Sequence, residues 1–121
     1  MAANVSRPVP TLSVQVQPNR VPDLDLAAVL VLFTSAAELA DAELEVAEGE
    51  DDGPYVNYNF RTQDLVRLWD ILQGQVFWSQ AIGPNLAKAS IVTCEGSHGW
   101  NDYLLLHHYD RTLALDALHG G

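Results

Sequence analysis

The chain is poor in cysteine and in basic residues, and each shortage excludes a class of protein. Cys94 is the only cysteine among 121 residues, so an internal disulfide is impossible. This composition fits a reducing compartment, and we expect a cytoplasmic protein. Six lysines and arginines stand against sixteen acidic residues, which gives a net charge of −10. Such a surface repels nucleic acid and anionic lipid, so we expect neither as a partner.

Long hydrophobic runs and chemical motifs are also missing. The longest apolar run, LAAVLVLF at 26–33, is far shorter than the roughly 20 residues that span a bilayer. The opening MAANVSRPVP lacks the features of a signal peptide. The sequence has no phosphate-binding glycine loop, no paired cysteines, and no metalloprotease or serine-hydrolase motif. We therefore expect no cofactor and no association with a membrane.

What the chain does contain predicts one folded domain. Hydrophobic residues make up 48% of the sequence, enough for a buried core at this length. Residues 1–10 carry two prolines and no periodic pattern, which is typical of a flexible N-terminal arm. We expect residues 11–121 to form a single domain.

Hydrophobic periodicity then indicates a mixture of strands and helices. Residues 11–17 alternate as a strand with one polar face, and residues 43–60 are typical of a hairpin. Residues 24–42 predict one long helix with Asp23 as N-cap, the alternative being a strand followed by a short helix. A second helix after the N-cap candidate Thr62 has an apolar stripe, and further strands follow at 90–96 and 102–110. The stripe consists of Leu65, Leu68, Trp69, Leu72 and Val76.

The resulting order, β-α-β-β-α-β-β, predicts an α+β fold. Its first six elements match the split βαβ, ferredoxin-like order, in which an antiparallel sheet carries two helices on one face. The last strand would extend the sheet. It is apolar on both sides, with Tyr103 and Leu105 on one and Leu104 and Leu106 on the other, so both sides must be covered. The second cover is either a short helix at 112–119 or another protein chain.

The stretch TCEGSHGWND at 93–102 invites a catalytic interpretation, but a hairpin tip explains it better. Strand pairing predicts Cys94 opposite Tyr103, in an apolar layer where a thiol is inert. Glycine and asparagine form turns, which makes a Glu95–His98 acid–base pair the weaker alternative. Trp100 at the tip is a natural anchor for a partner.

A metal site near the end of the chain is also disfavoured. His107 and His108 are neighbours in a strand and point to opposite faces. His108 and Asp110 share a face, but two ligands are too few for zinc. We therefore predict no metal site and no catalytic residue.

The acidic residues carry the functional hypothesis. Eight of the sixteen lie between residues 38 and 52 without an intervening lysine or arginine: Glu38, Asp41, Glu43, Glu45, Glu48, Glu50, Asp51 and Asp52. We predict a non-enzymatic module that binds a basic partner protein, of the general kind of inhibitors and immunity proteins. The predicted contact residues are Glu48, Glu50, Asp51, Asp52 and Trp100. The alternatives are a homodimer built on the two-sided strands and an enzyme acting near residues 93–110.

Overall fold

The computed structural model of the chain describes residues 9–95, 103–116 and 118. Within these residues, five strands form one open antiparallel sheet and three α-helices pack against it, so the predicted α+β class is confirmed. The strand order is β2-β3-β1-β4-β5, which makes β2 and β5 the two edges. The bounds of the elements are β1 Thr11–Val16, α1 Leu26–Ala40, β2 Glu43–Glu50, β3 Pro54–Arg61, α2 Leu65–Leu72, α3 Gly83–Ala87, β4 Ser90–Glu95 and β5 Tyr103–His108.

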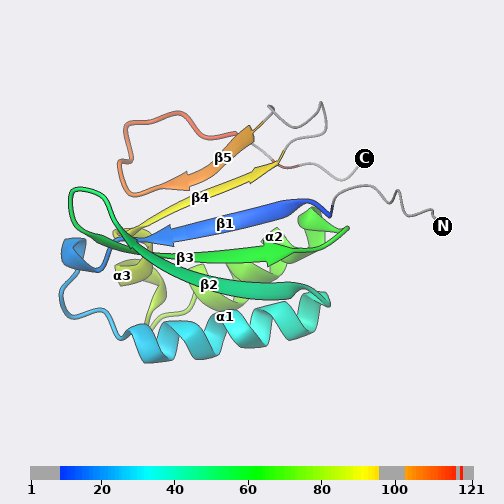
Figure 1. The fold of residues 1–121 in the computed structure, drawn as a ribbon, viewed down its shortest axis with the longest axis horizontal. Helices are drawn as coiled ribbons and strands as arrows, with labels where there is room; N and C mark the ends of the chain where they lie inside the picture. Colours follow the sequence, from blue (N-terminus) through cyan, green and yellow to red (C-terminus); the bar gives the residue numbers. More distant parts are fainter. Residues whose placement is uncertain (1–8, 96–102, 117, 119–121) are drawn as a thin grey trace.

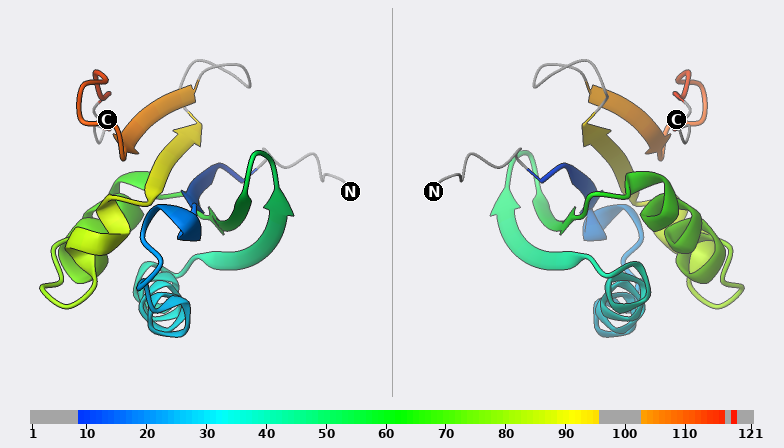
Figure 2. Two further views of the ribbon diagram at one scale, coloured as in Figure 1. Left: turned by 90° about the vertical axis from the view of Figure 1, so that its left-hand side faces the viewer. Right: turned by 90° about the vertical axis from the view of Figure 1, so that its right-hand side faces the viewer.

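The helices lie on one side of the sheet, and the sheet curves around them (Figures 1 and 2). In the view of Figure 1, α2 and α3 lie behind the strands and α1 runs below them. The described residues place no helix on the opposite face, which we call the open face. No helix in the described part of the chain has the length and apolar character needed to cross a membrane.

The central strand β1 shows why the sheet has two unlike faces. Leu12, Val14 and Val16 are fully buried against the helices, whereas Ser13 and Gln15 alternate with them on the open face. The same alternation continues in β3 and β4, where buried Val56, Tyr58, Phe60, Val92 and Cys94 complete the sheet side of the core. The pattern of period two therefore separates an apolar core from a polar sheet surface.

The predicted segment 24–42 contains a single helix, α1 at Leu26–Ala40, as predicted, and not a strand followed by a helix. The N-cap is Asp25 and not Asp23, because the Asp25 side chain accepts a hydrogen bond from the Ala28 amide. Val29, Phe33 and Ala36 are among the residues that face the core. At its C-terminal end Asp41 adopts the left-handed conformation (φ 54°), and its amide bonds back to the last carbonyls.

The predicted hairpin at 43–60 is confirmed, with β2 paired to β3 from Glu43 opposite Arg61 to Glu50 opposite Pro54. Asp51, Asp52 and Gly53 form the connecting turn. Asp52 has φ 56° and Gly53 has φ 127°, a conformation that glycine adopts without a steric penalty. The turn thus exposes two carboxylates at one end of the sheet.

The second helix is shorter than its hydrophobic stripe. Its N-cap is Asp64 and not Thr62: the Asp64 side chain accepts from the Arg67 amide, while the Thr62 hydroxyl accepts from the Asp64 amide. A π-helix at Gln73–Phe77 follows directly and keeps Val76 buried. The helix α3 then begins at Gly83, and Gly83 is required because a Cβ atom there would overlap the Phe77 carbonyl.

The β4–β5 register differs from the prediction. Cys94 pairs with Leu104, one residue away from the predicted partner Tyr103, and a bulge between Val92 and Thr93 then pairs Val92 with His107. Shifting an antiparallel pairing by one residue exchanges the faces of a strand. Leu104 therefore lies on the core side with Cys94, whereas the predicted core residue Leu105 lies opposite Thr93 on the open side.

The C-terminal segment also differs from the prediction. Residues 112–116 are not helical; instead the Asp116 amide donates to the Leu105 carbonyl, and the Leu105 amide donates to the Asp116 carboxylate. This reciprocal pair closes the outer edge of β5 at one point. Asp116 thus bonds to the edge of β5 instead of lying in a helix over its second face, and Leu118 packs against the core.

Candidate functional site

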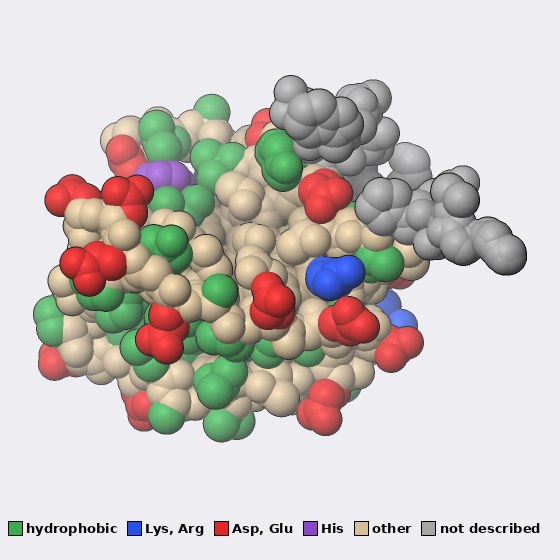
Figure 3. All heavy atoms as spheres, in the orientation of Figure 1, with side chains coloured by type: hydrophobic (Ala, Val, Ile, Leu, Met, Phe, Trp, Pro, Cys, Tyr) green, Lys and Arg blue, Asp and Glu red, His purple; other side chains and the backbone are tan. Residues whose placement is uncertain are grey.

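The eight acidic residues of the 38–52 segment are all exposed, but they do not form one cluster. Glu38, Asp41 and Glu43 lie where α1 ends and β2 begins, whereas Glu48, Glu50, Asp51 and Asp52 lie at the far end of β2. A strand of eight residues spans about 25 Å, which is well beyond the Debye length of about 8 Å at physiological salt. At physiological salt, the two groups of carboxylates therefore attract a charged partner independently of each other. The second group, Glu48, Glu50, Asp51 and Asp52, is called here the acidic hairpin end, and Figure 3 shows acidic side chains at that end of the molecule.

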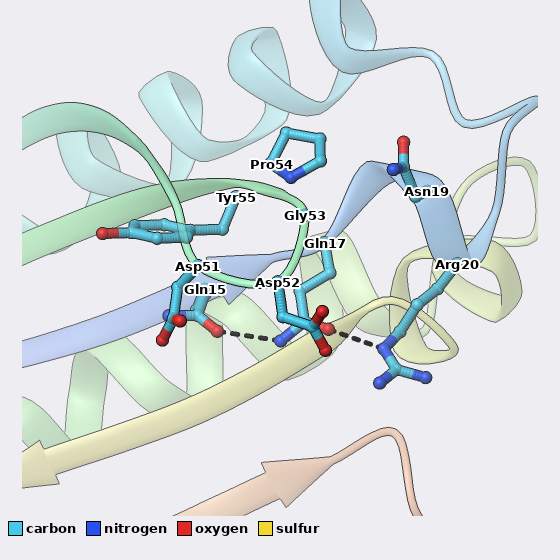
Figure 4. Close-up of a pocket in the computed structure, with 9 residues that line it drawn as sticks. All are labelled: Gln15, Gln17, Asn19, Arg20, Asp51, Asp52, Gly53, Pro54 and Tyr55. Carbon is cyan, nitrogen blue, oxygen red and sulfur yellow. Dashed lines mark hydrogen bonds between the residues drawn. The ribbon is translucent and has the colours of Figure 1, made fainter.

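Within the acidic hairpin end, the four carboxylates point to more than one side. Glu48 lies opposite Val56, a buried core residue, so it shares the helix side of the sheet. Burial raises the pKa of Tyr58 above its ordinary value, and the negative charge of Glu48 raises that pKa further. Asp51 and Asp52 instead turn toward the end of β1 (Figure 4). The hairpin end thus presents charge on both sides of the edge strand.

Asp51 and Asp52 help to line a hollow of about 310 Å³ between the hairpin turn and the loop after β1. The loop contains a short 3-10 helix, η1, at Pro18–Arg20. Carboxylates, side-chain amides and one guanidinium group line this hollow. It therefore offers negatively charged acceptors, a positively charged donor group and neutral amides that both donate and accept. Its lining residues are Gln15, Gln17, Asn19, Arg20, Asp51, Asp52, Gly53, Pro54 and Tyr55 (Figure 4).

A chain of hydrogen bonds fixes the basic side of this hollow. The side-chain Nε2 of Gln17 donates to Gln15 Oε1 over 2.9 Å, and Arg20 Nε donates to Gln17 Oε1 over 2.6 Å. Arg20 Nη2 donates to the Tyr109 hydroxyl over 2.7 Å, and its guanidinium lies 3.5 Å from the centre of the Tyr109 ring. Arg20 therefore joins the β1 end to the segment after β5. Sequence reasoning missed this site, because residues 20 and 109 are 89 positions apart.

The residues suggested for chemistry are engaged elsewhere. Cys94 is buried, as predicted. His107 Nε2 lies 2.8 Å from the Ala87 carbonyl and its ring packs on Phe77, whereas His108 Nδ1 accepts from the Asp110 amide. The two histidines thus have different neighbours. In the part of the chain that the structure describes, no three histidine, cysteine or acidic side chains come together as metal ligands.

Asp110 and Glu95 have structural partners of their own. The Asp110 carboxylate accepts from both the amide and the hydroxyl of Thr112, and these bonds hold its pKa below the ordinary value. Glu95 accepts from the Thr11 amide at the start of β1. Their carboxylates therefore stabilise a turn and a strand end.

Two tryptophans, Trp100 and Trp78, bear on partner binding. Trp100 and His98 lie outside the described residues, so their predicted place at a hairpin tip stays a prediction. Trp78 follows the π-helix, and 73% of its side chain is exposed. It falls off the helical stripe that ends at Val76, which is the signal in the sequence that could have marked it as a surface residue.

Comparison with known proteins adds no family to this description. No protein-family model matches the chain, and neither a curated protein nor a solved structure matches it significantly.

Proposed function

We propose that the protein is a non-enzymatic module that binds a basic partner protein through the acidic hairpin end, as an inhibitor or immunity-type protein does. The observation that carries the proposal is the exposure of all four carboxylates around one turn. Within the described residues, none of the four forms an ion pair with a lysine or arginine. Four unneutralised charges at the end of an edge strand attract a cationic surface from a distance.

The exposed charges should affect the association rate with a basic partner more than they affect the binding energy of the complex. Exposed ion pairs contribute only about 0–1 kcal/mol each, so no single carboxylate dominates. The combined field of a chain carrying −10 nevertheless accelerates encounters with a cation, and this acceleration weakens as salt screens it. Capture should therefore be fast at low salt and strongly salt-dependent.

We propose two further features of this protein. The ferredoxin-like arrangement is supported by the place of β1 between β3 and β4, with β2 outside β3 and α1 and α2 on the same side. The cytoplasmic location is supported by the single buried cysteine, which fits a reducing compartment. The binding proposal depends on neither.

The test compares two variants of equal net charge. The first neutralises the acidic hairpin end with Glu48→Gln, Glu50→Gln, Asp51→Asn and Asp52→Asn. The control carries Glu38→Gln, Asp41→Asn, Glu43→Gln and Asp70→Asn, which are exposed residues outside the acidic hairpin end. Association rates are measured by stopped flow with the basic protein that co-purifies with the wild-type chain, over a range of salt.

We expect the hairpin variant to associate at least about tenfold more slowly at low salt, with a flatter salt dependence, while the control loses much less. Both variants should unfold like the wild type, because exposed turn residues contribute little to stability. Equal association rates for the two variants would mean that only the total charge matters. Wild-type rates for the hairpin variant would remove the acidic hairpin end from the interface.

A further inference from the structure

The two edges of the sheet differ in what bonds to them. At β5, Asp116 bonds to the backbone of Leu105 and occupies part of the edge. At β2, no described residue bonds to the backbone on the side away from β3. None of the residues of β2 is buried, and Figure 2 shows β2 as the outermost strand on its side of the sheet. The described part of the chain therefore leaves β2 as an open edge.

The hydrogen-bond register identifies the unused backbone groups of β2. The Thr62 amide donates to the Pro10 carbonyl over 3.2 Å, one position beyond the last β1–β3 pair, so the even-numbered residues of β3 direct their backbone groups toward β1. The odd-numbered residues of β3 direct theirs toward β2, where their partners are also odd-numbered, as in the pair of Ala47 with Asn57. The amides and carbonyls that point outward from the sheet are those of Leu44, Val46, Glu48 and Glu50.

The side chains of β2 indicate the chemistry of a strand that could pair with these groups. Glu48 lies opposite the buried Val56, so Glu48 and Glu50 are on the helix side of the sheet, and Glu43 and Glu45 are on the open face. The strand contains no lysine or arginine. A second copy of β2 would set glutamates against these glutamates and be repelled. A strand with basic side chains would form pairs of opposite charge instead.

We propose that β2 binds an extended basic segment of a partner protein, which joins the sheet as an additional strand antiparallel to β2. This inference rests on the proposed function, since it names the form in which a basic partner binds. The outward amides and carbonyls hold the segment, and the glutamates select basic over acidic sequences. Antiparallel pairing is the more stable arrangement, and every described pair in this sheet uses it.

The proposal also assigns separate roles to charge and to backbone. The acidic hairpin end lies at one end of the open edge, so its carboxylates raise the rate of encounter with a cationic segment. Hydrogen bonds to the backbone of β2 then slow the release of that segment. Charge should therefore control association, and the outward backbone groups should control dissociation.

The first experiment detects strand addition directly on the protein. The probe is the capped peptide Lys-Thr-Lys-Thr-Val-Lys-Val-Lys, which sets a lysine opposite each glutamate of β2 when it pairs antiparallel from Glu50 to Glu43. At saturating peptide, the amide protons of the even-numbered residues 44 to 50 should exchange with solvent at least about tenfold more slowly, measured by NMR on the isotope-labelled full chain. The odd-numbered amides already bond to β3 and should change little. Binding without this alternation would overturn the proposal.

Two N-methylated peptides of identical charge provide the matched comparison. The third and fifth residues of the probe lie opposite Glu48 and Val46 and direct their amides toward β2, whereas the fourth and sixth direct theirs away. Methylating the third and fifth amides should weaken binding at least about tenfold, because two hydrogen bonds are lost. Methylating the fourth and sixth should leave the affinity unchanged. Equal affinities of the two analogues would overturn strand addition and leave the proposed function intact, because attraction between charges does not depend on which amide is methylated.

A protein variant completes the test without any change of charge. Val46→Pro removes an outward donor and no bond to β3, so it should fold like the wild type by circular dichroism and bind the probe at least about tenfold more weakly. The control Val46→Ala keeps the amide and should retain most of the affinity. With the basic protein that co-purifies, Val46→Pro should leave the association rate unchanged and raise the dissociation rate. A folded Val46→Pro variant that binds the probe as tightly as the wild type would refute the proposal. If the hairpin variant associated at the wild-type rate while Val46→Pro still accelerated release, the acidic hairpin end would fail and the open edge would stand.

Discussion

Phe33 provides the sharpest test of how α1 is attached to the sheet. Its side chain is fully buried, and its ring lies 4.6 Å from that of Tyr58 and 5.6 Å from that of Phe60, measured between centroids. The second pair is nearly perpendicular, with 81° between the ring planes. Both tyrosine and phenylalanine belong to β3, so Phe33 connects the middle of α1 to one strand of the core.

The expected cost of Phe33→Ala follows from these contacts. Removing a buried phenylalanine side chain costs about 3–5 kcal/mol of unfolding free energy, including the cavity that remains. Each aromatic pair contributes about 0.5–1.5 kcal/mol beyond buried area. Phe33→Leu keeps most of the apolar volume but loses both pairs, so it should cost about 1–3 kcal/mol. Domains of this size have about 5–15 kcal/mol in total, so the alanine variant loses a large share.

Urea unfolding followed by circular dichroism measures both costs. With a slope of about 2 kcal/mol/M, a loss of 4 kcal/mol lowers the unfolding midpoint by about 2 M. Val31→Ala on the opposite side of the same helix is the control and should change stability by less than about 0.5 kcal/mol. If Phe33→Ala cost less than about 1 kcal/mol at an unchanged slope, α1 would not pack on β3 through this ring.

Two further outcomes follow from individual groups in the core. Burial and the Glu48 charge raise the pKa of Tyr58 above 10.0, so the protonated phenol favours the folded state and the free energy of unfolding falls as the pH rises past about 10. Glu48→Gln should move the titration of Tyr58, followed by tyrosinate absorbance, to lower pH; an unchanged titration would show that Glu48 does not act on this phenol. Cys94 is 2% exposed, so native protein should react slowly with a thiol reagent and unfolded protein rapidly. Rapid modification of the native protein would contradict its burial.

The strands and helices were largely predictable because each follows from a local pattern. The alternation at Leu12, Val14 and Val16 identified β1, and the length of the apolar segment identified α1 as one helix. The N-cap residues were less predictable, because two candidates lie only two positions apart at each helix. Asp23 and Asp25 both precede α1, and Thr62 and Asp64 both precede α2. Which side chain accepts the amide hydrogen bond depends on the path of the incoming loop.

Features that depend on distant contacts were not predictable. The register of Cys94 with Leu104 and the bulge between Val92 and Thr93 leave no mark in the sequence, yet together they decide which β5 residues face the core. The C-terminal segment was one of two predicted covers for the last strand, as a short helix or else replaced by another chain, but Asp116 bonds to Leu105 and residues 112–116 are not helical. The acidic residues were close in sequence, and only the length of β2, which separates its two ends, shows that they lie in two groups.

The two edges of the sheet also determine how the protein behaves when it is concentrated. An uncovered edge strand can add strands from neighbouring molecules and begin a fibre. At β5, the hydrogen bonds between Asp116 and Leu105 occupy part of the strand edge. Along β2, the carboxylates of Glu43, Glu45, Glu48 and Glu50 repel an approaching copy of the chain. The acidic edge therefore protects the sheet against strand addition through the negative charge of its side chains. Replacing these glutamates with glutamine would remove that protection and favour intermolecular strand pairing.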